Sequence, residues 1–447
     1  MSTVVAKPIL CASNLTFERL EPDAERVAGF CLDYPRPMSA TDLQAIEVEG
    51  WVVGRKSAAV AIELVHEDVL MRKAPVKASR PDVVAKFPKV TVPVQCGFWT
   101  ALGTLGLAPQ FALRLDVVFE DQHRETLGIL RGNHQPAASG YEPQLRPLMI
   151  TSLGRTGTTW LIRLLSEHPE ISTHRLYPYE TRISAYWMQA LKVLSEPCDR
   201  WSSAHPETFQ ENMSFLGHNP FYYSVPARSA ETEADKQVTE WMSNVQAARL
   251  TAFCQQRIDE LYLQIAESQG ERRPVYFVEK YPQAGHLAWM VWSLYANARE
   301  VFLFRDFRDM LCSMLAFNAK RGFPSFGRRK VDSDLAFVET LKSNISRIIQ
   351  DWQMRSDQAL LVRYEDLILE PSDVLRTILR YLDLDHEPVI VERMLKAASR
   401  GSRDLDGHRT VAEATDSIGR WKRDLPPHLL AACQDMFGDL LSKLGYE

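Results

Sequence analysis

The segment that most constrains the fold is PLMITSLGRTGTTWLIRLL, residues 147–165. Residues 148–151 have the apolar run of a short buried strand, and Gly154 and Gly157 allow a tight turn after it. Thr158 begins a helix whose first turn offers unpaired N–H groups and the positive end of the helix dipole to an anion. The apolar side chains at one helical face are Trp160, Leu161, Leu164 and Leu165. This strand, loop and helix together predict a phosphate-binding turn in an α/β domain.

The loop differs from the Walker A motif, which has the pattern G-x-x-x-x-G-K-[ST] and a lysine that reaches the terminal phosphates. Ser152 occupies the position of the first glycine, and Thr158 occupies the position of the lysine. The nearest cation is Arg155, inside the loop. We therefore expect a nucleotide without a γ-phosphate. Taken alone, the loop is equally compatible with an ordinary turn between a strand and a helix.

Composition and charge limit the classes of protein to consider. The chain has 447 residues and a formal net charge of −5, which argues against a nucleic-acid-binding protein with a basic face. Its seven cysteines contain no C-x-x-C pair, which is typical of a reducing compartment. The first 25 residues lack a signal-peptide pattern, and no apolar run is long enough to span a membrane. We expect a cytoplasmic protein without a membrane span.

The length predicts more than one domain. We expect an irregular N-terminal arm over residues 1–43, a small antiparallel β-sandwich domain over 44–133, a linker over 134–147 and an α/β domain over 148–447. The β domain is indicated by short alternating apolar runs separated by glycine and charged turns. Within it, residues 97–105 are interpreted as a loop or a short helical turn.

In the last 300 residues, helical and strand patterns alternate, which predicts an open parallel sheet with helices on both faces. Helices are expected over 183–195 and 241–268, and strands over 275–280 and 300–306. Between them, residues 196–240 are polar and irregular, and we interpret this stretch as a lid or as an insertion that binds the acceptor.

Polar side chains follow several of the predicted strands, at the edge where open α/β sheets bind ligands. Arg305 follows one strand, and Ser313 lies two turns into the next helix, so the pair could hold a second phosphate. Three further positions are Lys280 and Tyr364 at strand ends and the basic segment from Arg420 to Lys422. An alternative for the first group is an ion-paired helix start made of Arg305, Asp306, Arg308 and Asp309.

The order and spacing of these motifs resemble those of the sulfotransferase family. The resemblance covers roughly residues 147–430 and rests on GRTGTTW, a strand-end lysine, FRD-x₆-S, RYEDL and a late GRWK. It implies a P-loop-like parallel sheet flanked by helices and the donor 3′-phosphoadenosine 5′-phosphosulfate (PAPS), used without a metal. It further implies a 5′-phosphosulfate site lined by Arg155, Thr156, Gly157, Thr158, Thr159 and Trp160. In the same way, Arg305 and Ser313 would hold the 3′-phosphate, and Tyr364, Arg420 and Lys422 would close over the nucleotide.

Within the family, the motifs look most like those of tyrosylprotein sulfotransferases and their bacterial relatives. The loop carries Arg155 where cytosolic small-molecule enzymes carry lysine, and the segment after Lys280 has no histidine. The segment YETRIS, residues 179–184, resembles the segment that holds the catalytic glutamate in that branch. The resemblance makes Glu180 the general base, whereas Lys280 and Arg155 would stabilise charge on the departing oxygen. The alternatives are His174 or His286 as the base, or Glu180 paired with Arg182 or Arg175.

The sequence analysis thus predicts transfer of a sulfuryl group from PAPS to an acceptor hydroxyl, leaving adenosine 3′,5′-bisphosphate. A carbohydrate or glycolipid acceptor is favoured by a weak likeness of the β domain to modules on bacterial sugar-modifying enzymes, and a tyrosyl or other phenolic hydroxyl comes second. Two other functions remain open at this stage. One is a magnesium-dependent P-loop kinase, which requires the missing lysine, and the other is a non-catalytic carbohydrate-binding protein with a degenerate transferase domain.

Overall fold

The structure is a computed structural model, and it describes residues 11–87, 93–135, 139–197, 233–270, 273–281, 285–400 and 407–446. The chain forms two compact units that do not follow chain order. The first comprises Met1–Glu142, Trp187–Gln256 and Ala284–Ala296, and the second comprises Pro143–Tyr186, Arg257–Gln283 and Asn297–Glu447. Most of the predicted insertion, residues 198–232, lies outside the described residues.

The second unit is built on a five-stranded sheet with the order β12-β13-β11-β14-β15, in which every neighbouring pair is parallel. Its strands are β11 (Arg146–Thr151), β12 (Ile171–Ser172), β13 (Tyr276–Tyr281), β14 (Arg299–Phe304) and β15 (Leu360–Arg363). The three central strands, β11, β13 and β14, are almost entirely buried. Continuous burial is expected of parallel strands that are covered on both faces, and it explains their unbroken apolar sequences.

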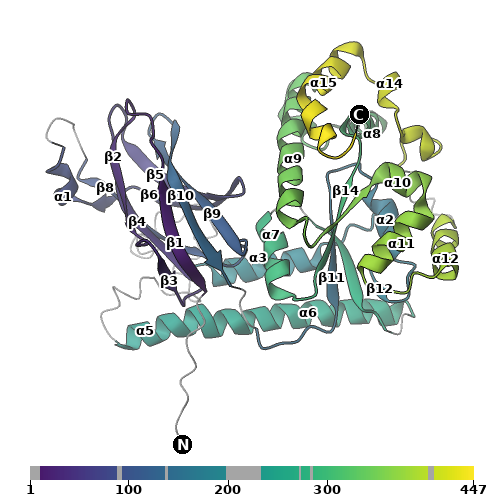
Figure 1. Cartoon of the computed structure of the whole chain (residues 1–447), viewed down its shortest axis with the longest axis horizontal. Coiled ribbons are helices and arrows are strands. Elements are labelled where there is room, and N and C mark those ends of the chain that lie inside the picture. The colour runs from purple at the N-terminus through teal and green to yellow at the C-terminus, as the bar shows by residue number, and fades with distance from the viewer. Residues whose placement is uncertain are drawn as a thin grey trace, which may run out of the picture. The chain divides into compact units, whose positions relative to one another are not determined.

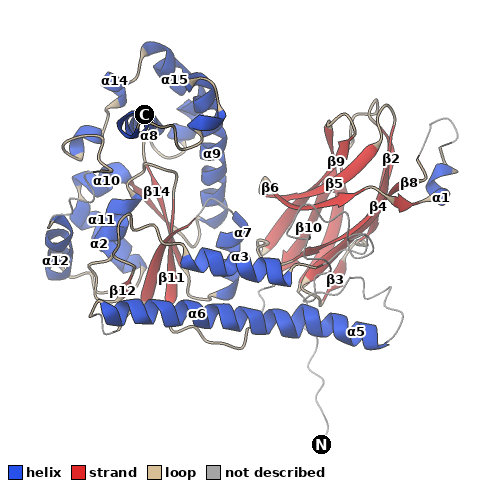
Figure 2. Ribbon diagram, turned by 180° about the vertical axis from the view of Figure 1, so that it is seen from behind, coloured by secondary structure: helices blue, strands red, loops and turns tan. Residues whose placement is uncertain are grey.

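Helices cover both faces of this sheet, as Figures 1 and 2 show. One hydrophobic cluster joins the sheet to α2 (Thr158–Leu165), α11 (Pro371–Tyr381) and α12 (Pro388–Ser399). A second cluster joins it to α8 (Phe307–Arg321), α9 (Asp334–Arg355) and α15 (Pro427–Ser442). The predicted fold class, a parallel sheet flanked by helices, is therefore confirmed.

Shorter helices connect these layers. They are α10 (Tyr364–Leu369), α14 (Trp421–Asp424) and the 3₁₀ turns η5 (Arg328–Lys330) and η6 (Thr415–Ser417). The helix α3 spans Ile183–Ser195, the range predicted from the sequence, and the division between the two units falls inside it. It also falls inside α6 (Ala247–Ser268).

The first unit contains two antiparallel sheets with the orders β3-β1-β10-β9-β5-β6 and β2-β4-β8-β7. The strands are β1 (Ala12–Arg19), β2 (Val27–Tyr34), β3 (Ser39–Thr41), β4 (Ala45–Gly54), β5 (Ala59–His66), β6 (Val69–Pro75), β7 (Ala78–Ser79), β8 (Gln95–Gly103), β9 (Gln110–Phe119) and β10 (Arg124–His134). Buried side chains from both sheets form one hydrophobic cluster, which includes Leu15, Phe30, Ile62, Phe98 and Leu115.

Two expectations for this region are corrected. Residues 11–41 are not an irregular arm, because β1, β2 and β3 lie in them and β1 pairs with β10 along its length. Only two of the eight residues in β1 are buried, and register shifts interrupt the pairing of β2 with β4, so neither strand shows a clean alternation. Residues 97–105 are not a loop either, because most of them belong to β8.

Helices also belong to the first unit: α1 (Pro81–Val84), α5 (Glu233–Glu240), the π-helical turn η4 (Trp241–Gln246) and α7 (Gly285–Leu294). The backbone N–H of Gln44, before β4, donates to Ser243 Oγ of η4 at 2.6 Å. The indole of Trp289 in α7 donates to Glu67 Oε1 at 2.7 Å. This unit is therefore more than the predicted β domain, since helices from later in the chain are hydrogen-bonded into it.

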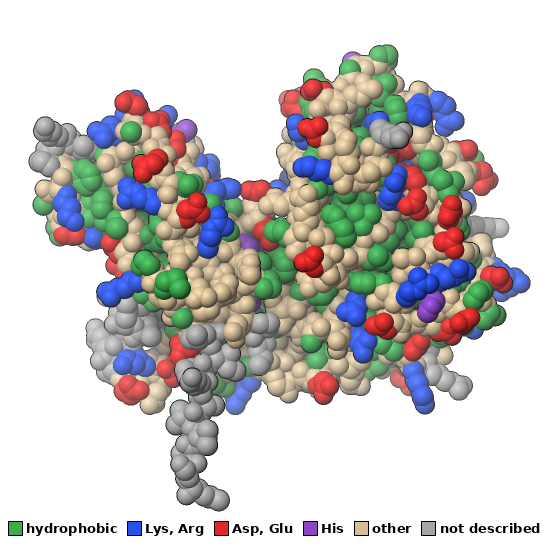
Figure 3. Space-filling view, viewed as in Figure 1, with side chains coloured by type: hydrophobic (Ala, Val, Ile, Leu, Met, Phe, Trp, Pro, Cys, Tyr) green, Lys and Arg blue, Asp and Glu red, His purple; other side chains and the backbone are tan. Residues whose placement is uncertain are grey.

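Acidic and basic side chains are intermixed on the face of each unit that is visible in Figure 3, as expected from the small net charge. Among the described residues, no helix has the length and apolar character that a bilayer crossing requires.

Candidate functional site

The glycine loop lies between β11 and α2 and is held in a conformation that glycine alone adopts easily. Gly157 precedes α2 with φ of 95°, in the left-handed region. A Cβ built on Gly157 would lie 2.5 Å from the ring of Tyr364, so the ring packs directly on the loop backbone. Arg155 also has a positive φ, of 68°, which is uncommon for a residue with a side chain. The conformation of the loop is thus fixed by the left-handed backbone at Arg155 and Gly157 and by the Tyr364 ring packed against it.

The other predicted residues of this loop divide into two groups. Thr156 is buried and its hydroxyl donates to the carbonyl of Leu153 at 3.0 Å, so it shapes the loop from inside. Thr158 is buried at the start of α2, whereas Thr159 is partly exposed. Trp160 packs against the hydrophobic cluster of that face of the sheet. The loop therefore offers the backbone around the start of α2 to an anion more than it offers hydroxyl groups.

Arg305 and Ser313, predicted to hold one phosphate, lie together with Arg155. The guanidinium of Arg155 donates from Nε to Ser313 Oγ at 3.1 Å and from Nη2 to the carbonyl of His408 at 2.6 Å. Arg305 donates from Nη1 to the carbonyl of Arg155 at 3.1 Å and from Nη2 to that of Ser417 at 2.7 Å. The structure thus joins the glycine loop, the start of α8 and the segment before α14 around two arginines.

Neither of these two guanidinium groups is neutralised by a carboxylate within the described part of the chain, because their partners are carbonyls and a hydroxyl. Arg305 is only 4% exposed, and its Nε has no hydrogen-bond partner among the described residues. Burial, together with the nearby positive charges of Arg305 and Arg420, lowers the pKa of Arg155 to about 10. Glu180 acts in the opposite direction on Arg155, but no ion pair holds either guanidinium within the described residues. Two cations held close together at partly or fully buried positions are costly, and an anion bound beside them reduces that cost.

Tyr364 links the loop to this cationic pair. Its ring packs on Gly157, and the guanidinium carbon of Arg305 lies 4.5 Å from the ring centroid. Its hydroxyl is 2.9 Å from Ser417 Oγ. The residue begins α10, directly after β15, as its predicted place at a strand end requires. Tyr364 therefore orients Arg305 through a cation–π contact as well as supporting the loop.

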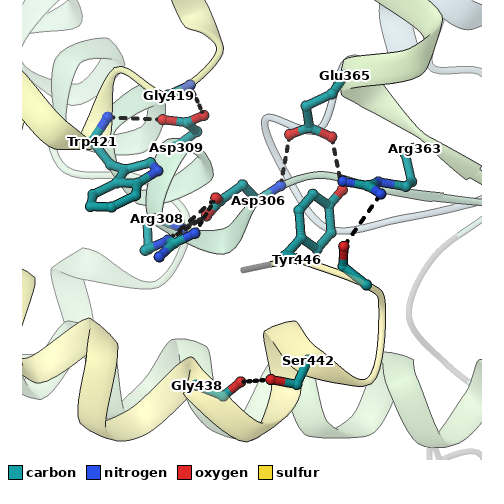
Figure 4. Close-up of polar contacts among 11 residues, drawn as sticks. Asp306, Arg308, Asp309, Arg363, Glu365, Gly419, Trp421, Gly438, Ser442 and Tyr446 are labelled. Atoms are coloured by element: carbon teal, nitrogen blue, oxygen red, sulfur yellow. Dashed lines mark hydrogen bonds and ion pairs between the residues drawn. The ribbon is translucent and has the colours of Figure 1, made fainter.

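The start of α8 fastens the C-terminal segments to the site, as Figure 4 shows. Asp309 accepts hydrogen bonds from the backbone N–H groups of Gly419 and Trp421, at 2.6 and 2.9 Å. Burial raises the pKa of the Asp309 carboxyl to about 6. Glu365 in turn accepts from the backbone N–H of Asp306 and from the hydroxyl of Tyr446.

The alternative interpretation of the α8 start is half correct. Asp306 does pair with Arg308, at 2.7 Å, and also accepts from its backbone N–H as the N-cap of α8. Arg305, however, takes no part in this ion pair and turns toward the glycine loop. The sequence FRDFRD thus contains a structural ion pair, Asp306 with Arg308, and one arginine, Arg305, that lies outside this pair and could bind an anion.

The two predicted basic residues near the C-terminus have different environments. Arg420 is buried and bound to Asp424, at 2.6 Å, and to Thr410 Oγ1, at 2.9 Å. Its charge is therefore largely compensated. Lys422 is exposed, with its Nζ 5.4 Å from the ring centroid of Trp421.

The predicted base and its lysine form a second cluster in the same unit. Lys280, in β13, donates from Nζ to Glu180 Oε1 at 2.7 Å. The exposed fractions of the two side chains are 11% and 29%, so the lysine is mostly buried while the carboxylate remains accessible. Arg182 lies 3.8 Å from Glu180 Oε2 on a more exposed side. The predicted alternative of a Glu180–Arg182 pair is thus present as a longer contact beside the shorter one to Lys280.

The two histidines considered as alternative bases have different environments. His286 belongs to the first unit, whereas Glu180 and Lys280 belong to the second, and burial lowers the pKa of His286 to about 4. His174 follows β12 and is partly buried. Within the described ranges, no three His, Cys, Asp or Glu side chains are grouped so that they could hold a metal ion.

Three site residues escaped the sequence analysis. The carbonyl of His408 binds Arg155, and the ring of Phe317 lies 4.5 Å from the guanidinium carbon of Arg155 and 5.3 Å from the ring of His408. Ser417 binds both Arg305 and Tyr364. A contact made by a backbone carbonyl cannot be predicted from the type of residue. Phe317, however, lies one helical turn beyond Ser313 on α8, and this spacing could have identified it as a neighbour of the site.

An open hollow adjoins this arrangement within the second unit. It has a volume of about 490 Å³ and is lined by Ala316, Lys320, Arg409, Thr410, Val411 and Ala412. Lys320, in the last turn of α8, donates to the carbonyl of Arg409 at 3.0 Å. The hollow thus lies between α8 and the segment whose His408 carbonyl contacts Arg155.

The chain is similar to known sulfotransferases in sequence and in fold. A model described as "Sulfotransferase family" matches residues 147–388. The zebrafish (Danio rerio) protein named Carbohydrate sulfotransferase 1 is 24% identical over 208 residues, and the match spans 43% of this chain and 49%, or about half, of that relative. Two solved structures are similar over 68% of this chain. A sulfotransferase domain from the curacin biosynthetic pathway has a TM-score of 0.39 and 16% identity, with 99% of it covered. Mouse sulfotransferase SULT7A1 complexed with PAP has a TM-score of 0.36 and 11% identity, with 86% covered.

Proposed function

Because this chain belongs to the sulfotransferase family, we propose that it moves a sulfuryl group from PAPS to a hydroxyl of an acceptor. The observation that carries the proposal is the pair of the partly buried Arg155 and the buried Arg305, which lies beside the glycine loop and has no ion-pair partner in the described part of the chain. PAPS bears two separate anionic groups, a 3′-phosphate and a 5′-phosphosulfate, and we assign each to a different part of the site.

The 3′-phosphate is assigned to Arg305 and Ser313. The unpartnered Nε of Arg305 is a buried donor that needs an acceptor, and a guanidinium binds phosphate with charge-assisted hydrogen bonds. Ser313 adds a hydroxyl that already lies within hydrogen-bond distance of Arg155. The side chain of Arg155 therefore lies on the 3′-phosphate side of the site, although its backbone belongs to the glycine loop.

The 5′-phosphosulfate is assigned to the loop and the start of α2. The residues expected from the sequence are Arg155, Thr156, Gly157, Thr158, Thr159 and Trp160. Thr156 and Trp160 contribute through the backbone, because the Thr156 hydroxyl is bound to the Leu153 carbonyl and the Trp160 side chain packs on the hydrophobic cluster. Backbone N–H groups at the start of α2 and the positive end of its dipole favour an anion there. Tyr364, Arg420 and Lys422 complete the nucleotide site, with Tyr364 fixing both the loop and Arg305.

Glu180 and Lys280 perform the transfer step. The acceptor hydroxyl gives its proton to the Glu180 carboxylate while its oxygen forms a bond to sulfur. The bond between sulfur and the bridging oxygen breaks, and its electron pair leaves with adenosine 3′,5′-bisphosphate. Lys280 has three N–H donors, so it can hold Glu180 and still donate to the bridging oxygen. The exposed carboxylate and buried ammonium suit these roles, since the base must meet the acceptor.

For the acceptor we propose a carbohydrate or glycolipid hydroxyl first and a phenolic hydroxyl second. The first choice is supported by the similarity to the zebrafish protein named Carbohydrate sulfotransferase 1, and the second by the resemblance of YETRIS to the tyrosylprotein branch. We further propose that the protein acts in the cytoplasm, where PAPS is available to it, with no metal ion in the transfer step.

A ligand screen tests the donor assignment. Adenosine 3′,5′-bisphosphate should raise the melting temperature, whereas ATP with magnesium and free sugars should leave it unchanged. Incubation with [³⁵S]PAPS and either an alkyl glycoside or a simple phenol should label one of the two acceptors. Stabilisation by ATP with magnesium alone would favour a kinase, and stabilisation by sugars alone would favour a carbohydrate-binding protein.

A further inference from the structure

A buried carboxylate on β13, Glu279, occupies the position next to Lys280 and serves none of the roles assigned above. Only 1% of the residue is exposed. Because side chains alternate along a strand, Glu279 and Lys280 point to opposite faces of the sheet. Tyr276 and Val278 lie on the same face of β13 as Lys280 and belong to the hydrophobic cluster of that face. Phe277 lies on the other face with Glu279 and stacks on Tyr262 of α6, with ring centroids 4.6 Å apart.

On its own face, Glu279 holds the start of α3. The backbone N–H of Ser184 donates to Glu279 Oε1 at 2.9 Å and to Oε2 at 3.1 Å, and the hydroxyl of Ser184 donates to Oε2 as well. The hydroxyl of Tyr262 donates to Oε1. Ser184 is the second residue of α3, whose first N–H groups have no partner inside the helix.

A carboxylate in this position replaces a normal helix cap. The residue before α3 is Arg182, whose side chain has no acceptor for the free N–H groups. A negative charge near a helix start is also favoured by the helix dipole. Burial raises the pKa of Glu279, while the hydrogen bonds from Ser184 and Tyr262 act in the opposite direction and favour its charged form.

The same short segment carries the proposed base. Glu180 lies four residues before Ser184, and it contacts Lys280 on the opposite side of β13 from the Glu279–Ser184 contact. The chain from 180 to 184 therefore passes over the end of β13 and is bound to two consecutive residues of that strand. Any loosening at Ser184 acts on the position of Glu180 relative to Lys280.

We propose that Glu279 is a positioning residue for sulfuryl transfer, which caps α3 through Ser184 and thereby holds Glu180 at Lys280. The inference rests on the proposed function, because it assigns the role through Glu180. Glu279 would act through Ser184 and Glu180 and would contact neither the nucleotide nor the acceptor.

Glu279→Gln is the main test, because it keeps the shape of the side chain and replaces one acceptor oxygen with a donor. With [³⁵S]PAPS as donor and water as the acceptor, sulfate release should show a kcat lowered roughly 10- to 100-fold, since small misplacements of reacting groups have effects of this size. The KM for PAPS and the affinity for adenosine 3′,5′-bisphosphate should not change. Asp259→Asn is the matched control, because Asp259 of α6 is also fully buried and also accepts from two backbone N–H groups, those of Gln144 and Leu145, which precede β11 at the end remote from the glycine loop. It should lower stability without lowering kcat.

A double variant separates positioning from a general loss of stability. If Glu279 acts through Glu180, its effect should disappear once Glu180 is replaced, so Glu180→Gln/Glu279→Gln should be no slower than Glu180→Gln alone. A double variant that is slower by the full effect of Glu279→Gln would overturn the proposal. So would a single variant with the wild-type kcat.

Hydrogen–deuterium exchange gives a measurement that needs no turnover. Glu279→Gln should speed exchange at the Ser184 amide, and the Asp259→Asn control should not. Ser184→Ala, which removes only the hydroxyl, should show a smaller increase and serves if Glu279→Gln does not fold. Unchanged exchange in both variants would contradict the cap. Failure of the wild type to bind adenosine 3′,5′-bisphosphate would instead contradict the proposed function, whatever the exchange result.

Discussion

Lys280 donates a hydrogen bond to Glu180 at 2.7 Å, and this contact joins the end of a buried strand to an accessible carboxylate. The two residues are 100 positions apart in the chain, so the contact exists only because β13 and the segment before α3 meet at the carboxyl edge of the sheet. A pair formed by a base and a charge-stabilising donor is what transfer between oxygen atoms requires. The first predictions concern this pair.

Lys280→Ala should remove most turnover and leave nucleotide binding intact, because the lysine acts on charge that develops during transfer. We expect kcat to fall about 10²- to 10³-fold, the effect typical of one lost donor at a developing negative charge. Calorimetric titration with adenosine 3′,5′-bisphosphate should give the wild-type affinity. Lys342→Ala, on the exposed side of α9, is the control and should retain full activity. Normal turnover in Lys280→Ala would exclude the residue from the mechanism.

Glu180→Gln should lower kcat about 10²- to 10⁴-fold, because the amide cannot accept the acceptor's proton. The substitution keeps an oxygen for Lys280, so the fold and the affinity for adenosine 3′,5′-bisphosphate should be preserved. Steady-state rates of sulfate transfer from PAPS provide the measurement. Activity close to wild type would redirect attention to His174.

Arg305→Ala should weaken adenosine 3′,5′-bisphosphate at least about tenfold, since hydrogen bonds to charged groups contribute roughly 1.5–3 kcal/mol. Adenosine 5′-monophosphate lacks the 3′-phosphate, so its affinity should change much less. Arg305→Lys keeps the charge but not the planar fork, and should give an intermediate affinity for the bisphosphate. Arg329→Ala, at an exposed position of η5, is the control. Equal losses for both nucleotides would contradict the 3′-phosphate assignment.

Gly157→Ala should destabilise the protein and weaken nucleotide binding. Its φ of 95° is unfavourable for alanine, and the new Cβ would meet the Tyr364 ring at 2.5 Å. Backbone strain of this kind costs about 1–3 kcal/mol, before any displacement of the ring. Tyr364→Ala removes buried packing and is itself destabilising. Because it also removes the clash with the new Cβ, the loss of stability in the double variant should be smaller than the sum of the two single losses. An unchanged melting temperature in the single variant would show that the loop is looser than described.

Asp309 gives a pH dependence with a defined sign. Burial raises its pKa from 3.8 to about 6, so the folded protein holds this proton more tightly than the unfolded chain does. Its contribution to stability is therefore complete only well below pH 3.8 and is lost as the pH rises through 6. Relative to Asp309→Asn, which does not titrate, wild-type stability should fall by roughly 2 kcal/mol between pH 4 and pH 7. Denaturant unfolding at several pH values measures this, and parallel curves for the two proteins would contradict the raised pKa.

The long-range pairs explain what the sequence could and could not predict. The buried strands β11, β13 and β14 have continuous apolar runs, and α3 has a clear helical period, so their positions were predictable within a few residues. The strand β1 could not be predicted in this way, because only two residues of β1 are buried and its partner β10 lies more than 100 residues later in the chain. Edge or interrupted strands acquire their conformation from partners that local sequence does not contain.

The same distinction applies to the candidate site. Arg305, Ser313 and Tyr364 stand at positions set by strand ends, so spacing was enough to propose them. The partners that orient them include the carbonyls of His408 and Ser417, which any residue could supply. Glu279 was visible beside Lys280, but its role depends on α3 returning to the end of β13, which follows from tertiary structure alone.

The closeness of Arg155 and Arg305 has a consequence for the lifetime of the protein. The two cations repel each other, and a ligand that binds only the folded chain stabilises it in proportion to the logarithm of its concentration once that concentration exceeds the Kd. On the proposed function, the nucleotide would offset this repulsion. Resistance to proteolysis should then rise as adenosine 3′,5′-bisphosphate or PAPS is added, so the abundance of this chain would follow the supply of these nucleotides as well as its own synthesis.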